Sequence, residues 1–186
     1  GIQISAQKKT TKHFSVDVNF LLTSGLGSKY FAKSFVTSPG FQPSLNFHFY
    51  KNWTLSIAYK SLFLSIKDPV IYGNFSSVRY NSTSFGLSYI HELKPKLKLE
   101  EKLSYGEFKI ESSLENESST YQQTGKELNL GVKLVYFLDK SNQIGLVSGV
   151  ELQKLNSKIP IQNSYYEDFY SKSTTITPSL GLRLYF

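Results

Sequence analysis

The sequence predicts an all-β fold, an eight-stranded antiparallel up-and-down transmembrane β-barrel. Three observations indicate this class: eight segments alternate between apolar and polar residues, the connections between them alternate between long and short, and aromatic residues gather at the segment ends. Strict alternation gives a strand one apolar and one polar face. A transmembrane barrel requires strands of ~9–11 residues with this pattern, in an even number. We therefore expect one barrel domain over residues 13–186.

The first predicted strand, 13–23, shows the pattern that the other strands repeat. Phe14, Val16 and Val18 fall on one face, whereas Asp17 falls on the other face among small polar residues. The same alternation predicts the remaining strands at 41–51, 53–60, 79–90, 96–110, 126–138, 143–155 and 174–186.

Glycine, proline, serine and asparagine mark the segments between these strands. Long polar connections are predicted at 24–40, 65–77, 111–125 and 157–172. Short turns are predicted at 51–52, 91–95 and 139–142. Up-and-down barrels of membranes carry long loops on the outer side and short turns on the periplasmic side. The alternation therefore predicts that both termini are periplasmic.

Glu101 interrupts the apolar face of the fifth predicted strand. A carboxylate that faces lipid costs on the order of 2 kcal/mol or less. We therefore expect a β-bulge or a contact with another protein group at this position.

The polar faces carry charges of both signs among small residues, which suits a narrow barrel filled by its own ion pairs. The expected interior polar network consists of Asp17, His48, Lys60, Glu100, Lys133, Glu151 and Arg183. Asp17 and Arg183 should face each other, because the first and last strands adjoin in a closed barrel. A soluble lipocalin-like barrel with its apolar face inward is the alternative architecture.

Aromatic residues at the strand ends support the membrane interpretation, because such girdles anchor a barrel at both interfaces. The girdle on the short-turn side is expected to contain Phe14, Trp53, Tyr89 and Tyr136. The girdle on the other side is expected to contain Phe41, Tyr59, Phe63 and Tyr105.

The final segment, Thr174 to Phe186, alternates most strictly and ends on an aromatic residue. In this it resembles the last strand of bacterial outer-membrane β-barrels. The whole pattern looks like the small eight-stranded barrels of the OmpA-transmembrane or OmpX type, and the Tyr/Lys/Asn-rich style is similar to Bacteroidota members of the porin-like outer-membrane group. The resemblance implies location in the Gram-negative outer membrane and an assembly signal, read by the barrel-assembly machinery, at Leu182, Leu184 and Phe186.

Residues 1–12 lie before the first predicted strand. A small-residue pattern at Ser5, Ala6 and Gln7 indicates the remnant of a secretory signal peptide, and a flexible amino-terminal tail is the alternative.

Little in the sequence indicates cofactor, metal or catalytic chemistry. Cysteine is absent and no metal-ligand spacing occurs, so no cofactor or metal is expected. None of His13, His48 and His91 falls at the rim where a barrel enzyme would place an acid–base group, so we expect no enzymatic activity. The net charge of +7 is spread without a nucleic-acid motif, which favours lipopolysaccharide phosphates over nucleic acid as the partner.

An eight-stranded barrel has an interior just large enough for side chains, so an open pore is not expected. The remaining function is a structural or interaction role, as an anchor or an accessory subunit that binds another outer-membrane protein. The alternative is a barrel that binds a small apolar or amphipathic ligand, which would require an unfilled cavity.

Overall fold

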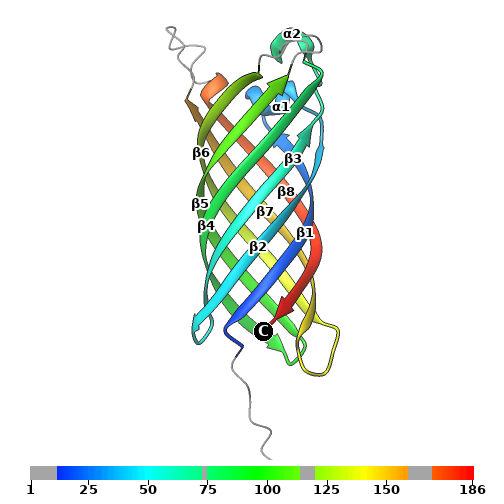
Figure 1. Cartoon of the computed structure of the whole chain (residues 1–186), viewed down its shortest axis with the longest axis vertical. Helices are drawn as coiled ribbons and strands as arrows, with labels where there is room; N and C mark the ends of the chain where they lie inside the picture. Colours follow the sequence, from blue (N-terminus) through cyan, green and yellow to red (C-terminus); the bar gives the residue numbers. More distant parts are fainter. Residues whose placement is uncertain (1–11, 73–74, 114–119, 159–168) are drawn as a thin grey trace, which may run out of the picture.

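The computed structural model describes residues 12–72, 75–113, 120–158 and 169–186. Eight antiparallel strands form a closed barrel in sequence order, and β1 closes the barrel against β8 (Figure 1). The predicted fold class is therefore confirmed. Among the described residues, no helix is long and apolar enough to cross a membrane.

The strands are long and the helices short. The elements are β1 (Phe14–Leu26), α1 (Tyr30–Ser34), β2 (Ser38–Tyr50), β3 (Trp53–Leu64), α2 (Pro69–Tyr72), β4 (Ser77–Lys94), β5 (Leu97–Ser113), β6 (Thr120–Phe137), β7 (Ile144–Lys158) and β8 (Lys172–Tyr185). β1 begins and β8 ends at one end of the barrel, which we call the terminal end (Figure 1). α1 and α2 lie at the opposite end, which we call the helix end.

Several predicted boundaries were wrong. The β5–β6 ladder continues to the pair Ser113–Thr120, so the loop predicted at 111–125 shrinks to 114–119. That segment has the same length as the connection 138–143, so the predicted alternation of long and short connections fails for this pair. The turn predicted at 91–95 was also wrong, because β4 continues to Lys94. Apolar alternation marks the lipid-facing part of a strand, whereas backbone pairing continues beyond it among polar residues.

The loop predicted at 24–40 contains the end of β1, all of α1 and the start of β2. Two glycines that suggested a loop instead permit close packing. A Cβ on Gly25 would lie 2.4 Å from the Ala32 Cα, so the glycine lets α1 pack directly on β1. A Cβ on Gly40 would lie 2.3 Å from the Ser61 carbonyl oxygen across the β2–β3 ladder.

The apolar faces of the strands point outward. Val18 and Leu130 are 58% and 60% exposed, whereas Asp17 and Arg183 are completely buried in the lumen. This arrangement is the inverse of a soluble barrel, so the lipocalin-like architecture is wrong. A continuous apolar exterior of this kind is suited to lipid.

Apolar side chains close both ends of the lumen. At the helix end, α1 contributes the buried Phe31 and Phe35 to a cluster that we call the helix-end plug. Its other buried members are Leu21, Leu62, Leu64, Val78, Tyr80, Phe108, Ile110 and Leu155. A smaller cluster at the terminal end contains Val135, Phe137, Val147 and Tyr185. The polar network lies between these two apolar layers.

Residues 1–11 lie outside the described residues, so the signal remnant or tail stays a prediction. Lys12, the last residue of that segment, is described. Its ammonium group donates hydrogen bonds of 2.7 Å to the carbonyl oxygens of Ser141 and Asn142 in the β6–β7 turn.

Candidate functional site

The strongest polar feature of the lumen is an ion cluster of Asp17, Glu100, Lys133 and Arg183. Asp17 and Arg183 are direct cross-strand partners, as the sequence suggested. The guanidinium donates to both Asp17 carboxylate oxygens at 2.5 and 2.7 Å, and its third contact is the Glu100 carboxylate at 2.6 Å. The Lys133 ammonium lies 3.2 Å from Asp17. Bidentate geometry of this kind offsets the cost of removing the charges from water.

A second layer lies nearer the helix end, where the Lys60 ammonium contacts the Glu151 carboxylate at 2.5 Å. Lys102 is also buried at this level, at 4% exposure. Within the part of the chain that the structure describes, no hydrogen bond or ion pair reaches its ammonium group. The lumen therefore holds a buried cation whose charge is not directly matched.

A third layer, just below the helix-end plug, is organised by Glu127. Its carboxylate accepts hydrogen bonds from the Tyr80 hydroxyl, the Gln153 amide and the Asn129 amide. Thr175 extends the layer by donating to the Gln153 amide oxygen at 3.0 Å. The sequence analysis missed Glu127. The signal was available, because Glu127 precedes the outward Leu128 on the sixth strand and so falls on the inward face.

His48 is half-buried and does not belong to the ion cluster. Its Nε2 lies 3.0 Å from the Ser15 hydroxyl and its Nδ1 lies 2.8 Å from the Thr54 hydroxyl. A serine beside a histidine resembles a nucleophile and its base. In a catalytic triad a carboxylate contacts the other ring nitrogen of the histidine, whereas the Thr54 hydroxyl occupies that place here. Ser15 is also completely buried. The contact is suited to closing the lumen at the terminal end.

Two voids of very different size lie in the described part of the barrel. A gap of about 10 Å³ lies beside Lys102, Lys133 and Glu151, which is room for one water molecule at most. A larger cavity of about 260 Å³ opens at the terminal end, with Lys12, His48, Lys98 and Tyr185 among its lining residues.

Glu101 faces outward in a regular ladder, opposite Tyr89 on β4 and Val132 on β6. Of the two alternatives expected at this position, the structure therefore does not have the bulge. The expected contact with another protein group is present, because the His91 Nε2 lies 3.6 Å from the carboxylate on the same outer wall.

The predicted terminal-end girdle residues all point outward. Trp53 and Tyr89 are cross-strand partners with ring centroids 5.0 Å apart. Phe14 contacts Phe47, with centroids 5.1 Å apart, and Tyr136 is exposed on β6. The proposed assembly residues Leu182, Leu184 and Phe186 are also exposed on the outer wall. Their role as a signal stays a prediction.

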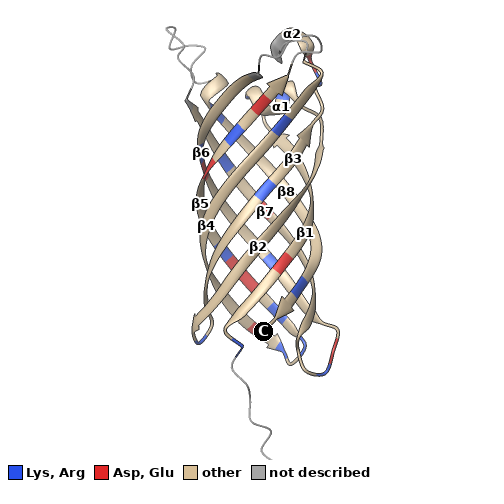
Figure 2. Cartoon of the chain, viewed as in Figure 1, with Lys and Arg blue, Asp and Glu red and all other residues tan. Residues whose placement is uncertain are grey.

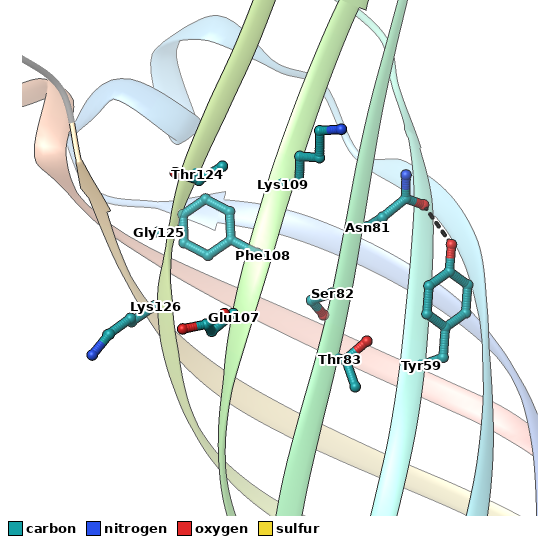
Figure 3. Close-up of a pocket in the computed structure, with 10 residues that line it drawn as sticks. All are labelled: Tyr59, Asn81, Ser82, Thr83, Glu107, Phe108, Lys109, Thr124, Gly125 and Lys126. Carbon is teal, nitrogen blue, oxygen red and sulfur yellow. Dashed lines mark hydrogen bonds between the residues drawn. The ribbon is translucent and has the colours of Figure 1, made fainter.

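The outer wall near the helix end is hollowed and polar. One hollow of about 490 Å³ spans β3 to β6, where the Tyr59 hydroxyl donates to Asn81 and the Lys109 and Lys126 side chains extend from the wall (Figure 3). A neighbouring groove of about 480 Å³ also includes Lys126. We call this second hollow the lysine groove; its lysines are Lys29, Lys126, Lys154 and Lys172.

Comparison with known proteins identifies the fold. No family model matches the sequence, and no curated protein matches it significantly. Solved structures do match over nearly the whole chain. Neisserial surface protein A is 15% identical, with a TM-score of 0.67, over 93% of this chain and 97% of that chain. The Ail attachment invasion locus protein of Yersinia pestis is 13% identical, with a TM-score of 0.58, over 94% and 99%.

The outer membrane protein OprG from Pseudomonas aeruginosa is 11% identical, with a TM-score of 0.58, over 94% of this chain and 96% of that chain. At these identities the similarity concerns architecture. Together with the outward apolar wall, it shows that this chain has the fold of the small eight-stranded outer-membrane β-barrels.

Proposed function

We propose that this chain is a non-conducting barrel of the outer membrane that acts through its surfaces, as an anchor or accessory subunit of a larger outer-membrane assembly. The observation that carries the proposal is the lumen, which is filled by three polar layers and closed by apolar side chains at both ends. A lumen of this kind favours neither diffusion nor ligand storage, so the surfaces remain as the place of function.

The helix end is the best candidate surface for a protein partner. Val70 on α2 is 96% exposed. Nearby on the same end, Tyr30 of α1 packs against Phe169 and Tyr170, with ring centroids 6.3 and 5.1 Å apart. The three aromatic residues are half-buried. An exposed apolar side chain beside partly exposed aromatic rings is typical of a protein interface.

A ligand-binding role receives less support. The gap among the lumenal charges has room for a single water at most, and the larger cavity at the terminal end is lined mainly by polar and charged side chains. A catalytic role is not part of the proposal, because Ser15 is completely buried and the second group that contacts His48 is the Thr54 hydroxyl, where a triad has a carboxylate.

Crosslinking in intact membranes, followed by mild solubilisation and mass spectrometry, tests the proposal. We expect one defined partner to crosslink to the wild-type chain and to be lost from a Val70→Asp variant. A Val18→Ala variant, altered on the lipid-facing wall, is the matched control and should retain the partner. Recovery of the wild-type chain as a monomer without crosslinks would refute the accessory role, and stepwise ion currents in planar bilayers would refute the non-conducting barrel.

A further inference from the structure

The hollow of Figure 3, which we call the polar hollow, combines aromatic, neutral polar and charged groups on the outer wall near the helix end. Tyr59, which lines it from β3, is 43% exposed. The neutral polar side chains of the outer surface are Asn81, Thr83 and Thr124, and the charged side chains are Glu107, Lys109 and Lys126. The volume of about 490 Å³ falls in the range of sites for small organic ligands.

Strand register brings these residues together in two rows. Successive cross-strand partners on β3 to β6 form the first row, which consists of Tyr59, Thr83, Glu107 and Lys126. The second row, two residues nearer the helix end on β4 to β6, consists of Asn81, Lys109 and Thr124. The residues of both rows are exposed or half-buried, whereas the row between them is buried and consists of Ser82, Phe108 and Gly125. The two outward rows therefore form one surface over four strands.

The charges of the polar hollow are compensated locally. The Lys109 ammonium contacts the Glu111 carboxylate at 2.6 Å. Lys126 is the cross-strand partner of Glu107, and its ammonium also lies 5.8 Å from the centroid of the Tyr105 ring. Figure 2 shows acidic and basic residues together on the strands near the helix end. Each cation of the hollow therefore has an acidic neighbour among the described residues, which favours a neutral ligand over a strongly charged one.

The hydrogen-bonding groups of the hollow include both donors and acceptors. The hydroxyl groups of Tyr59 and Ser61 donate to the Asn81 amide oxygen at 3.0 and 2.8 Å. Because these contacts occupy the oxygen, the Asn81 N–H groups are left to donate to a ligand. The Thr83 hydroxyl both donates and accepts, and the Glu107 carboxylate accepts. A sugar is complementary to this set, because its hydroxyl groups donate and accept while its C–H face packs on an aromatic ring.

We propose that the polar hollow binds a neutral hexose unit of a saccharide. The Tyr59 ring packs against the C–H face of the sugar, the Asn81 amide donates to one sugar hydroxyl, and the Glu107 carboxylate accepts from another. The hexose belongs either to a glycolipid of the surrounding leaflet or to a free oligosaccharide, because both present the same chemistry. This inference goes beyond the accessory role and does not depend on a protein partner.

Amide chemical-shift titration of the folded barrel in detergent micelles tests the site with three probes. They are the neutral oligosaccharide maltotriose, a lipopolysaccharide whose core carries hexoses, and the same lipopolysaccharide truncated before its hexoses. The test variant, which we call the hollow variant, combines Tyr59→Leu with Asn81→Ala. The control variant combines Tyr136→Leu with Asn156→Ala, which changes two exposed residues of the same types on the outer wall outside the hollow.

We expect wild type and control to bind the hexose-bearing probes equally and the hollow variant to lose about tenfold in affinity. Binding of maltotriose assigns a free saccharide as ligand, and binding of the hexose-bearing lipopolysaccharide alone assigns the glycolipid. Binding of neither probe would overturn the proposal, and equal binding of the truncated lipopolysaccharide would overturn the sugar as the recognised group.

Two further outcomes test the place and the charge of the ligand. Retained binding by the hollow variant, or an equal loss in the control, would overturn the site. Added salt should leave the binding that the hollow variant loses unchanged, so a steep salt dependence would overturn the neutral class of ligand. Heat-modifiability on gels verifies that both variants are folded.

Discussion

The two halves of the lumen are filled by opposite means. The half near the terminal end is held by the ion cluster of Asp17, Glu100, Lys133 and Arg183, whereas the helix end is closed by the apolar helix-end plug around Phe31 and Phe35. Ion pairs require matched geometry, because each charge pays a desolvation cost that only its partners offset. Apolar packing is less directional and suits a segment, α1, that is attached at its ends. The ion cluster should therefore stabilise the folded barrel, and the helix-end plug should close the lumen at the helix end.

The largest effect is expected from Arg183→Met. The substitution leaves the Asp17 and Glu100 carboxylates buried with Lys133 as the remaining cation, and breaking such a network costs about 3–5 kcal/mol. Urea titration of the folded barrel in lipid vesicles measures the loss. Adding Asp17→Asn and Glu100→Gln to the same chain removes the unpaired charges and should recover most of the lost stability. An unchanged unfolding midpoint in the single variant would show that the cluster does not secure the barrel.

Phe31→Ala should cost about 3 kcal/mol of packing in the helix-end plug, since the ring is almost completely buried. Hydrogen exchange should show faster opening of α1, with a smaller change in strand amides. The exposed Val36, changed to Ala, is the control and should have little effect. The ion cluster still fills the lumen below, so bilayers should remain non-conducting. Conduction in the Phe31 variant would mean that the plug alone closes the barrel.

Lys102→Met should stabilise the barrel by about 2 kcal/mol, because an apolar chain of similar length replaces a buried cation that has no direct partner in the described part of the chain. Lys60→Met is the matched control and should destabilise it, because Glu151 loses its contact. The same urea titration compares both variants. Destabilisation by both substitutions would indicate that Lys102 also serves the network.

The smallest effect concerns the β6–β7 turn, outside the lumen. The Ser141 hydroxyl and the backbone amides of Ile144 and Gln143 donate to Asp139, and these hydrogen bonds lower the pKa of its carboxyl group. A lowered folded-state pKa contributes stability above the ordinary aspartate pKa of about 4, and this stability is lost as pH falls through the lowered value.

Amide chemical shifts of Gln143 and Ile144 should therefore stay constant as pH falls through 4 in the wild-type chain and change only at lower pH. Asp139→Asn removes this transition and serves as the control. A wild-type transition centred near pH 4 would contradict the shift.

Much of the lumen could be predicted because a two-residue period fixes the face of every side chain once the strand is known. Asp17 and Arg183 followed from this rule and from closure of the barrel. The boundaries did not, because Gly25, Pro39 and Gly40 signal a loop locally. Close packing of α1 on β1 and the ladders of β2 with β1 and β3 keep these residues in strands. For Glu101 the sequence left a bulge and a protein contact as alternatives, because it does not show that His91 of the adjacent strand lies beside the carboxylate.

The sequence by itself determined the strand number, the apolar exterior and the charged interior, because alternation and turn residues act locally along the chain. Only the tertiary structure decided which charges meet, which lumenal cation has no direct partner among the described residues, and that α1 closes the helix end. The lysine groove also depends on the tertiary structure, because its lysines come from separate segments of the chain and the register of β6, β7 and β8 places Lys126, Lys154 and Lys172 in two neighbouring rows of the wall. Register is a property of the closed sheet, so no single segment encodes it.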